Sequence, residues 1–207
     1  VVAADLGSLG LEGGTRPYSL NNQGEVVGRS TNNLGRNRPF LWTKDGGMID
    51  LGDLGAGFGR AYDINENSEV TGTSGAGAQG TNAFYWSALT GMIDLGAIVG
   101  TPSSRGYAIA DNGWIAGRVT YAVGAPLLTE AYVYRPVSGG APGEYEAVGL
   151  GTLGGNASNS ADLNDVGAVI GFSFVDATAF HAFYWTEDTG LVDMGTFCDG
   201  GGACGTT

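Results

Sequence analysis

The chain is built on a repeat of about 44 residues, and this repeat restricts its fold more than any other feature. One segment begins at an aromatic or alanine position, passes through a turn rich in Asn, Asp and Gly, and ends in a short apolar run that contains a glycine. It occurs four times, at residues 18–30, 62–74, 107–119 and 161–173. Repeats of this length are supersecondary units that bury a continuous core by lying against their neighbours.

Two further segments follow each copy in a constant order. An aromatic run lies at residues 39–43, 83–87, 131–135 and 182–186, and a closing run lies at 48–52, 92–96, 147–151 and 191–195. Residues 3–7 are a fifth copy of the closing run. We therefore treat residues 1–207 as a single repeat domain, with units at about 8–52, 53–96, 97–151 and 152–195. Residues 1–7 form an extra closing strand, and 196–207 form a tail or the start of a further unit.

Every unit offers four short runs rich in Val, Ile, Tyr, Phe and Trp, bounded by Gly, Asn, Asp or Ser, which predicts strands. No window has a helical period. Gly28, Gly72, Gly117 and Gly171 recur inside the second run, which indicates a backbone or ring too close for a Cβ atom. The sequence thus predicts an all-β, propeller-like array of four-stranded antiparallel blades, either a small closed ring or part of a larger ring or array. A β-solenoid is the main structural alternative.

Composition and charge limit the classes of partner that the chain is expected to bind. The chain has 21 acidic and 9 basic residues and a formal net charge of −12, which would repel a phosphate backbone and excludes nucleic acid as an expected partner. No stretch has the roughly 18 apolar residues of a membrane span. The first residue is Val1, which fits removal of a signal peptide or a trimmed chain. Cys198 and Cys204 flank a Gly-rich loop that could close a disulfide in an oxidising compartment.

The combined motifs resemble the HAF-repeat family, bacterial proteins expected to be extracellular and named for a His-Ala-Phe motif. The fourth unit has this motif from His181, and the second has Asn82 in place of the histidine. Arg38 and Glu130 stand at the histidine position of the other two units, and Pro39 replaces the alanine. The resemblance covers nearly the whole chain. It implies a secreted or surface-exposed β-repeat protein, and it carries over no catalytic residue.

Three arginines are candidate ligand-binding residues. Arg16, Arg60 and Arg105 each stand two residues before the aromatic position of the first run. Propeller geometry would gather them around a central mouth, where they suit a carboxylate or sulfate ligand. The alternative, favoured by the excess of acid, is a girdle of Arg–Asp pairs between blades. The acids that recur in the closing run are Asp5, Asp50, Asp94 and Asp193.

Other candidates carry weaker signals. Trp114 follows a turn where other units have Glu or Ala, so we expect an exposed contact residue. The equivalent Trp42, Trp86, Tyr134 and Trp185 are expected in the core rather than as a sugar-stacking ring. Asp63, Asn65, Asn67 and Glu69 place oxygens at alternate positions, as calcium loops do, but such residues are also ordinary in turns. No other cofactor is expected, and the lone His181 is expected to be structural.

We therefore expect a secreted, non-catalytic binding or adhesion module. Its variable loops (31–38, 75–82, 120–130 and 174–181) and unit connectors would share one face, and its partner would be a glycan or protein at an extracellular surface. The alternative is a structural protomer that assembles with copies of itself into a filament or surface layer by strand donation. A glycan-active enzyme is the third hypothesis, and it would need acids that converge in a cleft.

Overall fold

A computed structural model describes the chain except for residues 1–4, 12–13, 78–79, 101–102, 122–127 and 196–207. Strands account for 59% of the structure and helix for 2%, so the all-β prediction is confirmed. One helical turn, α1 (Gly96–Val99), was not predicted from the sequence. It begins at Gly96, the last residue of the second closing run, and its four residues are too few to show a helical period.

The same four-strand order recurs along the described chain. The first unit has β1 (Thr15–Leu20), β2 (Val26–Thr31), β3 (Asn37–Thr43) and β4 (Gly47–Asp50). The second has β5 (Gly55–Ile64), β6 (Val70–Ala76), β7 (Gly80–Ser87) and β8 (Gly91–Asp94). The third has β9 (Ser103–Ile109), β10 (Ile115–Tyr121), β11 (Leu128–Pro136) and β12 (Tyr145–Gly151). The fourth has β13 (Ser158–Leu163), β14 (Val169–Phe174), β15 (Phe180–Thr186) and β16 (Gly190–Asp193).

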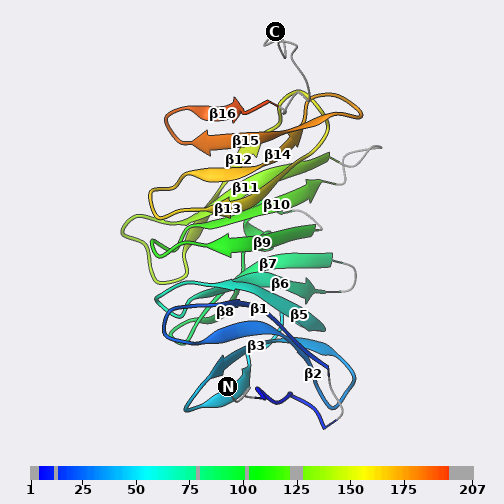
Figure 1. The fold of residues 1–207 in the computed structure, drawn as a ribbon, viewed down its shortest axis with the longest axis vertical. Coiled ribbons are helices and arrows are strands. Elements are labelled where there is room, and N and C mark those ends of the chain that lie inside the picture. The colour runs from blue at the N-terminus through cyan, green and yellow to red at the C-terminus, as the bar shows by residue number, and fades with distance from the viewer. Residues whose placement is uncertain (1–4, 12–13, 78–79, 101–102, 122–127, 196–207) are drawn as a thin grey trace, which may run out of the picture.

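The sheets are stacked in a row. Consecutive strands of each unit pair antiparallel, and the first and fourth units lie at opposite ends of the stack (Figure 1). The first strands β1, β5, β9 and β13 are neighbours, and each of the last three also packs on the second and third strands of the unit before it. Single parallel bridges, Thr81 to Ser103 and Thr129 to Ala157, join the later units. The described residues thus form an open stack rather than a closed four-bladed ring.

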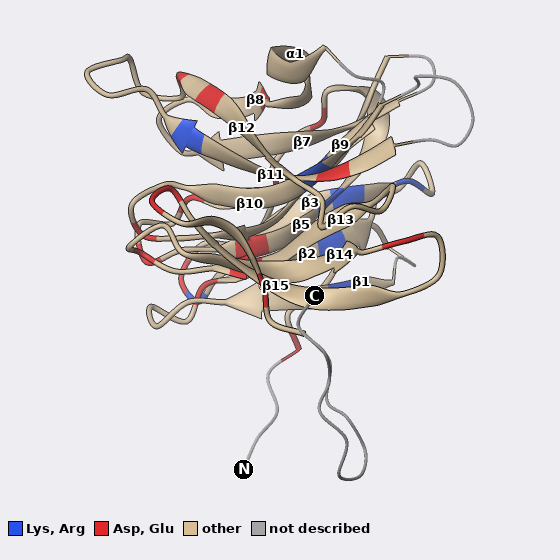
Figure 2. Ribbon diagram, turned by 90° about the horizontal axis from the view of Figure 1, so that it is seen from above, with Lys and Arg blue, Asp and Glu red and all other residues tan. Residues whose placement is uncertain are grey.

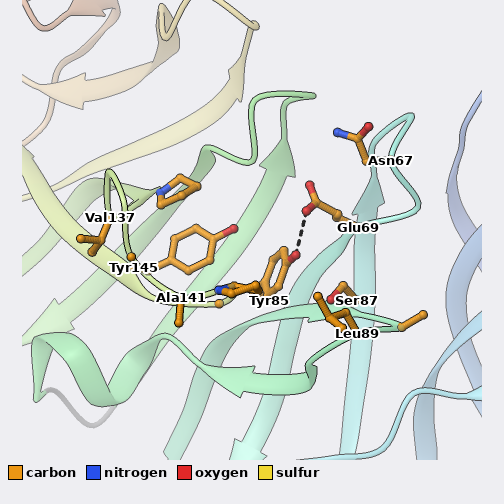
Figure 3. Close-up of a pocket in the computed structure, with 13 residues that line it drawn as sticks. Asn67, Glu69, Tyr85, Ser87, Leu89, Val137, Ala141 and Tyr145 are labelled. Carbon is orange, nitrogen blue, oxygen red and sulfur yellow. Dashed lines mark hydrogen bonds between the residues drawn. The ribbon is translucent and has the colours of Figure 1, made fainter.

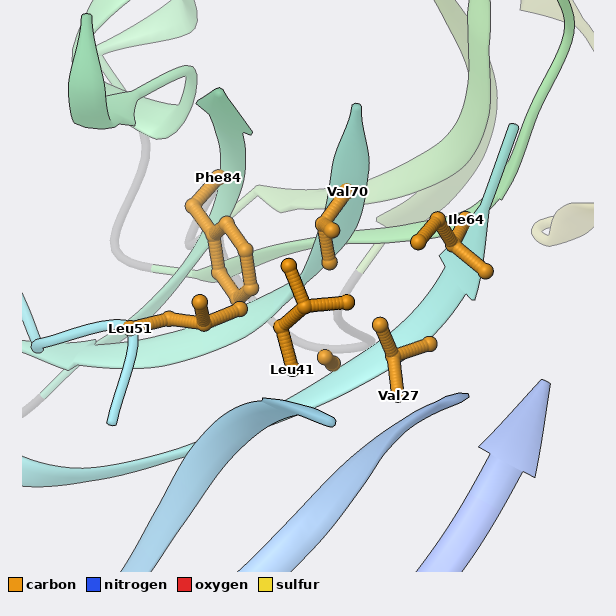
Figure 4. Close-up of a cluster of buried hydrophobic side chains, with 7 residues drawn as sticks. Val27, Leu41, Leu51, Ile64, Val70 and Phe84 are labelled. Carbon is orange, nitrogen blue, oxygen red and sulfur yellow. The ribbon is translucent and has the colours of Figure 1, made fainter. Parts of the chain in front are cut away.

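Apolar side chains fill each joint between units. In the first joint, the second-unit residues Ile64, Val70 and Phe84 pack on residues of the first unit (Figure 4). The first-unit side of this cluster is Val27, Leu41 and Leu51. Each such side chain contributes about 1.5–3 kcal/mol when buried, so every sheet depends on its neighbour. Trp86, Tyr134 and Trp185 belong to the clusters of the three joints, which places these three aromatics in the core. The equivalent Trp42 is half-buried and belongs to none of the three clusters, so the core prediction is wrong for this residue.

The repeated glycine of the second strand marks a close backbone approach. A Cβ atom on Gly72 would lie 2.0 Å from the Arg60 carbonyl oxygen and 2.8 Å from the Phe84 ring. The equivalent Gly28, Gly117 and Gly171 would bring a Cβ atom within 2.0–2.1 Å of a first-strand carbonyl. The glycine is therefore needed for space, as the sequence predicts.

Candidate ligand-binding edge

A bulge in each first strand sets the position of the repeated aromatic. The pairing of first with second strands skips one residue in every unit, and the skipped residues are Tyr18, Tyr62, Tyr107 and Ala161. A bulge bends its strand and turns the extra side chain away from the regular face. The three tyrosines form a ladder along the stack, with ring centroids 5.5 Å apart between Tyr18 and Tyr62 and 5.9 Å apart between Tyr62 and Tyr107.

The three predicted arginines lie on the same strands as this ladder. Arg16 and Arg60 are exposed and Arg105 is half-buried. Two more arginines stand opposite members of this set across the first hairpins, Arg29 opposite Arg16 and Arg118 opposite Arg105. We call these five arginines and Tyr18, Tyr62 and Tyr107 the tyrosine–arginine edge. The arginines run along the stack instead of surrounding a mouth.

The arginines of this edge are not neutralised. Within the part of the chain that the structure describes, none of the five forms an ion pair with an acid. Arg118 donates to the side-chain oxygen of Asn159 at 3.1 Å. The predicted girdle of Arg16, Arg60 and Arg105 with closing-strand aspartates is therefore absent from the described residues.

The closing-strand aspartates pair instead with the position before the Ala-Phe pair. Asp50 accepts from Arg38 at 2.9 Å, and the carboxylate of Asp193 contacts His181 Nδ1 at 2.9 Å. The hydrogen bond with His181 lowers the pKa of Asp193. In the third unit the closing strand has Gly149 in place of the aspartate, and Glu130 on the facing strand supplies the carboxylate and accepts from the Gly151 N–H at 2.9 Å. The lone histidine thus ties two strands together.

The fourth unit lacks the arginine and the tyrosine of the edge. Asn159 and Ala161 stand where the other units carry arginine and tyrosine, and a shallow hollow of about 360 Å³ lies there. Its lining residues are Tyr107, Arg118, Asn159, Ser160, Ala161 and Phe172. The hollow therefore places a tyrosine ring and a guanidinium group beside an empty aromatic position.

The turns that follow the first strands are tied to one another by polar contacts. The backbone N–H at the second turn position donates to the side-chain carboxylate at the same position of the next turn. These bonds run from Asn22 to Glu66, from Glu66 to Asp111 and from Asp111 to Asp165, at 2.8–3.0 Å. The side-chain amides of Asn21 and Asn65 also donate to the carbonyls of the next turns at 3.1 and 2.9 Å. Seen along the stack, the acidic turns gather on one side, away from the arginines of the edge (Figure 2).

The four calcium candidates take part in contacts within and between the turns. Asn65 Oδ1 accepts from the backbone N–H groups of Asn67 and Glu69, and Glu69 also accepts from the Tyr85 hydroxyl at 2.7 Å. Asp63 accepts from Ser19 and from the backbone of the third unit, and burial raises its pKa. In the described ranges, no group of three or more His, Cys, Asp or Glu is placed to hold a metal ion. Calcium stays a prediction.

A second cavity lies between the second and third units. It has a volume of about 530 Å³, and the hairpin that contains Val137, Ala141 and Pro142 covers one side of it (Figure 3). The rings of Tyr85 and Tyr145 contact each other there at a tilt of 46°, with centroids 5.2 Å apart, and burial raises the pKa of Tyr85 to about 12. Both tyrosines are already engaged, since Tyr85 donates to Glu69 and Tyr145 donates to a backbone carbonyl. Neither tyrosine hydroxyl proton is therefore free to bind a ligand in this cavity.

Trp114 is not the exposed contact residue expected from the sequence. Its side chain is half-buried and packs against the third core cluster. Arg135 lies over its ring at 5.7 Å from the centroid. The tryptophan takes the place of the turn glutamate of the first two units and covers Gly167 of the next turn, where an added Cβ atom would meet its ring at 2.9 Å. Trp114 therefore packs in the joint between the third and fourth units.

The variable loops and the unit connectors meet at the end of the sheets opposite the turns. The Thr31 N–H donates to the Gly14 carbonyl, and the Phe174 N–H donates to the Ala157 carbonyl, so loop and connector are in contact. Parts of the predicted loop face, at 78–79 and 122–127, lie outside the described residues, and so do Cys198 and Cys204 with their predicted disulfide. The described loops border the strand ends from which β1 and β9 begin, close to Arg16 and Arg105.

None of the described helical residues forms a segment of the length and apolarity that a membrane crossing requires. Comparisons with family models, with curated proteins and with solved structures found no match to this chain. The resemblance to the HAF-repeat family therefore depends on the motifs in the sequence, and the candidate site depends on the geometry described above.

Proposed function

We propose that the chain is a secreted, non-catalytic binding module that holds an extended anionic glycan along the tyrosine–arginine edge. The observation that carries this proposal is that five arginines with no acidic partner among the described residues and a continuous tyrosine ladder share the first hairpins of the first three units. The chain as a whole has a formal net charge of −12, but an anionic ligand would be attracted by the positive charge that these arginines concentrate on one edge.

The chemistry of the two residue types is complementary. The planar fork of a guanidinium group binds a carboxylate or sulfate through two parallel hydrogen bonds. Aromatic rings that are half exposed offer an apolar face to a sugar ring, and tyrosine adds a hydroxyl group at its edge. Because both types recur with the stacked units, a polymer with a charge on successive rings would contact several units at once, and these contacts multiply the affinity.

The surrounding fold supports the same function. Rigid stacked sheets keep the edge residues in fixed register, and the loops beside the edge differ in length and composition between units. We further propose that the stack is a segment of a propeller-like array, since its first strands adjoin while only weak contacts join its outer strands. The HAF-like motifs support an extracellular location, where acidic glycans are available ligands.

Titration calorimetry with polygalacturonate, dextran sulfate and uncharged dextran tests this function. We expect binding to one or both anionic polymers, with affinity that falls as salt rises, and no binding to dextran. The double variant Arg60→Gln with Arg105→Gln should lose at least about tenfold in affinity. Lys44→Gln is the matched control, because it removes a positive charge from a hairpin turn outside the edge. Equal losses in both variants, or no binding to either anionic polymer, would contradict the proposal.

A further inference from the structure

The outer face of the fourth unit is apolar, and no segment of the described chain covers it. Ile170, Tyr184 and Met194 are 47%, 38% and 63% exposed. Phe172 and Phe180 lie on the same face and contact each other edge to face at 5.8 Å. A contiguous apolar surface of this kind marks an interaction site more often than it marks free surface.

The repeat shows what such a face does elsewhere in the molecule. In the first three units, the residues equivalent to these three are all exposed by 6% or less. Ile170 corresponds to Val27, Thr71 and Ala116, and Tyr184 corresponds to Leu41, Tyr85 and Val133. Met194 corresponds to Leu51, Leu95 and Leu150. The following unit buries each of them. The fourth unit therefore carries the residues of a joint, and none of the units that the structure describes covers them.

Polar groups on this face of the fourth unit also lack the contacts that their equivalents make in the internal joints. Asn21 and Asn65 are buried and donate to the carbonyl of the next turn, whereas the equivalent Asn164 is exposed and its amide nitrogen has no partner among the described residues. The Ala83 and Ala131 N–H groups donate to serines of the next unit at 2.9 and 2.8 Å. The equivalent Ala182 is exposed. The face thus offers donors equivalent to those that the following unit accepts in the internal joints.

The opposite end of the stack presents the matching face. Leu20 of the first unit is 69% exposed, whereas the equivalent Ile64 and Ile109 are buried in joints. Thr15 provides a hydroxyl where Ser104 and Ser158 accept from the preceding unit. The first turn also keeps the backbone carbonyl of Asn21, which is equivalent to the acceptors in Asn65 and Ala110.

We propose that a second copy of this chain covers the fourth unit, with its first unit placed as a fifth unit would be. The joint repeats the three internal joints, so its occupant is the chain's own first-unit face. This contact is heterologous, because it uses a different surface on each partner, and such contacts continue into rings or filaments. The proposal is independent of the glycan-binding function, and it would extend the tyrosine–arginine edge across copies.

One segment has to move for this joint to form. Residues 5–9 already lie against the first unit as residues 50–54 lie against the second, since the Leu9 N–H donates to Ser30 Oγ and the Leu54 N–H donates to Ser74 Oγ, both at 2.9 Å. In the proposed joint, the end of the closing run in the fourth unit of the partner copy would occupy the site where residues 5–9 lie. Removal of residues 1–7 should therefore strengthen association. Assembly by strand donation requires the opposite result.

Sedimentation and light scattering over a concentration series test the proposal. We expect the mass of the intact chain to rise with concentration beyond that of a dimer. Ile170→Glu with Tyr184→Glu, on the fourth unit, and Leu20→Glu, on the first, should each reduce it to the monomer mass of 21.0 kDa. An equimolar mixture of these two proteins should form dimers, because one intact face of each kind remains. Leu89→Glu, at an exposed leucine outside both faces, should associate like the original chain.

Three results would overturn the inference. A chain that stays monomeric at every soluble concentration has no such joint. Dimers that survive Leu20→Glu would indicate contact between two fourth units instead. A chain that associates only after truncation behind Gly195 would show that residues 196–207 cover the face. Circular dichroism and thermal unfolding of every variant ensure that loss of association is not loss of the fold.

Discussion

The two ends of the first hairpins differ in how their polar groups are used. On the turn side, the Asn65 side chain makes contacts within its own turn and with the next, and the turn acids accept backbone N–H groups. On the edge, Arg16 and Arg60 are exposed, and neither forms an ion pair within the described ranges. The strands are the same, so the difference arises from the side chains alone. It indicates that the turns maintain the stack and that the edge is available to a ligand.

We expect the largest effect on stability from a substitution in the strand packing that both ends of the hairpins share. Gly72→Ala should lower the free energy of unfolding by about 3 kcal/mol, because the new Cβ atom would overlap the Arg60 carbonyl and the Phe84 ring. Urea unfolding followed by tryptophan fluorescence measures the change. Gly14→Ala, where no atom lies within 4 Å of the added Cβ, should change stability by less than about 0.5 kcal/mol. Equal effects would show that close approach does not explain the repeated glycine.

The turn side should be the next most sensitive. Asn65→Ala should cost about 2 kcal/mol, because it leaves buried backbone groups of two turns without partners. Asn164→Ala removes the same side chain from the last turn, which has no following turn in the described chain. We expect it to cost less than about 1 kcal/mol in the same unfolding experiment. An equal loss at both positions would contradict a stabilising contact between turns.

Asp63 gives the turn side a dependence on pH. Burial raises the pKa of Asp63 above the ordinary value of 3.8, so the unfolded chain loses this proton first as pH rises. The contribution of Asp63 to stability is therefore greatest below this value and falls as pH rises through the raised pKa. Asp63→Asn cannot lose the proton. The original chain should become less stable relative to this variant as pH rises through that window, and a difference that stays constant in urea unfolding would refute the burial effect.

The edge should show the smallest effect on stability. Arg16→Gln with Arg60→Gln alters exposed side chains that form no ion pair in the described structure, so the midpoint of urea unfolding should correspond to a change of less than about 0.5 kcal/mol. Affinity for the anionic polymer should nevertheless fall. A stability loss as large as that of Asn65→Ala would assign the arginines to the fold and remove the contrast between the two sides.

Much of the fold could be predicted because the repeat exposes it. The spacing of Gly28, Gly72, Gly117 and Gly171 predicted the close backbone approach, and the short β-prone runs predicted the strands. The open stack could not be predicted, because the number of units that close a ring depends on small angles at each joint. The single turn α1 was missed because four residues carry no period.

The candidate site was predicted in part. The sequence identified Arg16, Arg60 and Arg105 but not the tyrosine ladder, because the bulge that brings the rings together depends on pairing with the second strand. Substitutions that occur together in one unit could have shown which residues pair with the closing-strand aspartates. Glu130 appears in the unit whose closing strand has Gly149 in place of Asp, which indicates that these two positions face each other.

Coupling also explains a departure from the motif. Pro39 has no N–H, and the residue opposite it in the second unit is Gly59 rather than a serine that could accept a hydrogen bond. In the later joints, Ala83 and Ala131 donate to Ser104 and Ser158. The donor and the acceptor are therefore lost together, and no buried polar group is left without a partner in the first joint at this position.

Nuclear magnetic resonance of the chain labelled at tyrosine tests the central claim most directly. A short oligomer of the anionic polymer that binds is added stepwise, and the ring signals are followed. The account predicts shifts for Tyr18, Tyr62 and Tyr107, with the largest changes near the hollow beside Tyr107, while Tyr85 and Tyr145 stay unchanged. Shifts confined to Tyr85 and Tyr145 would place the ligand in the cavity between the second and third units and would contradict the role assigned to the edge.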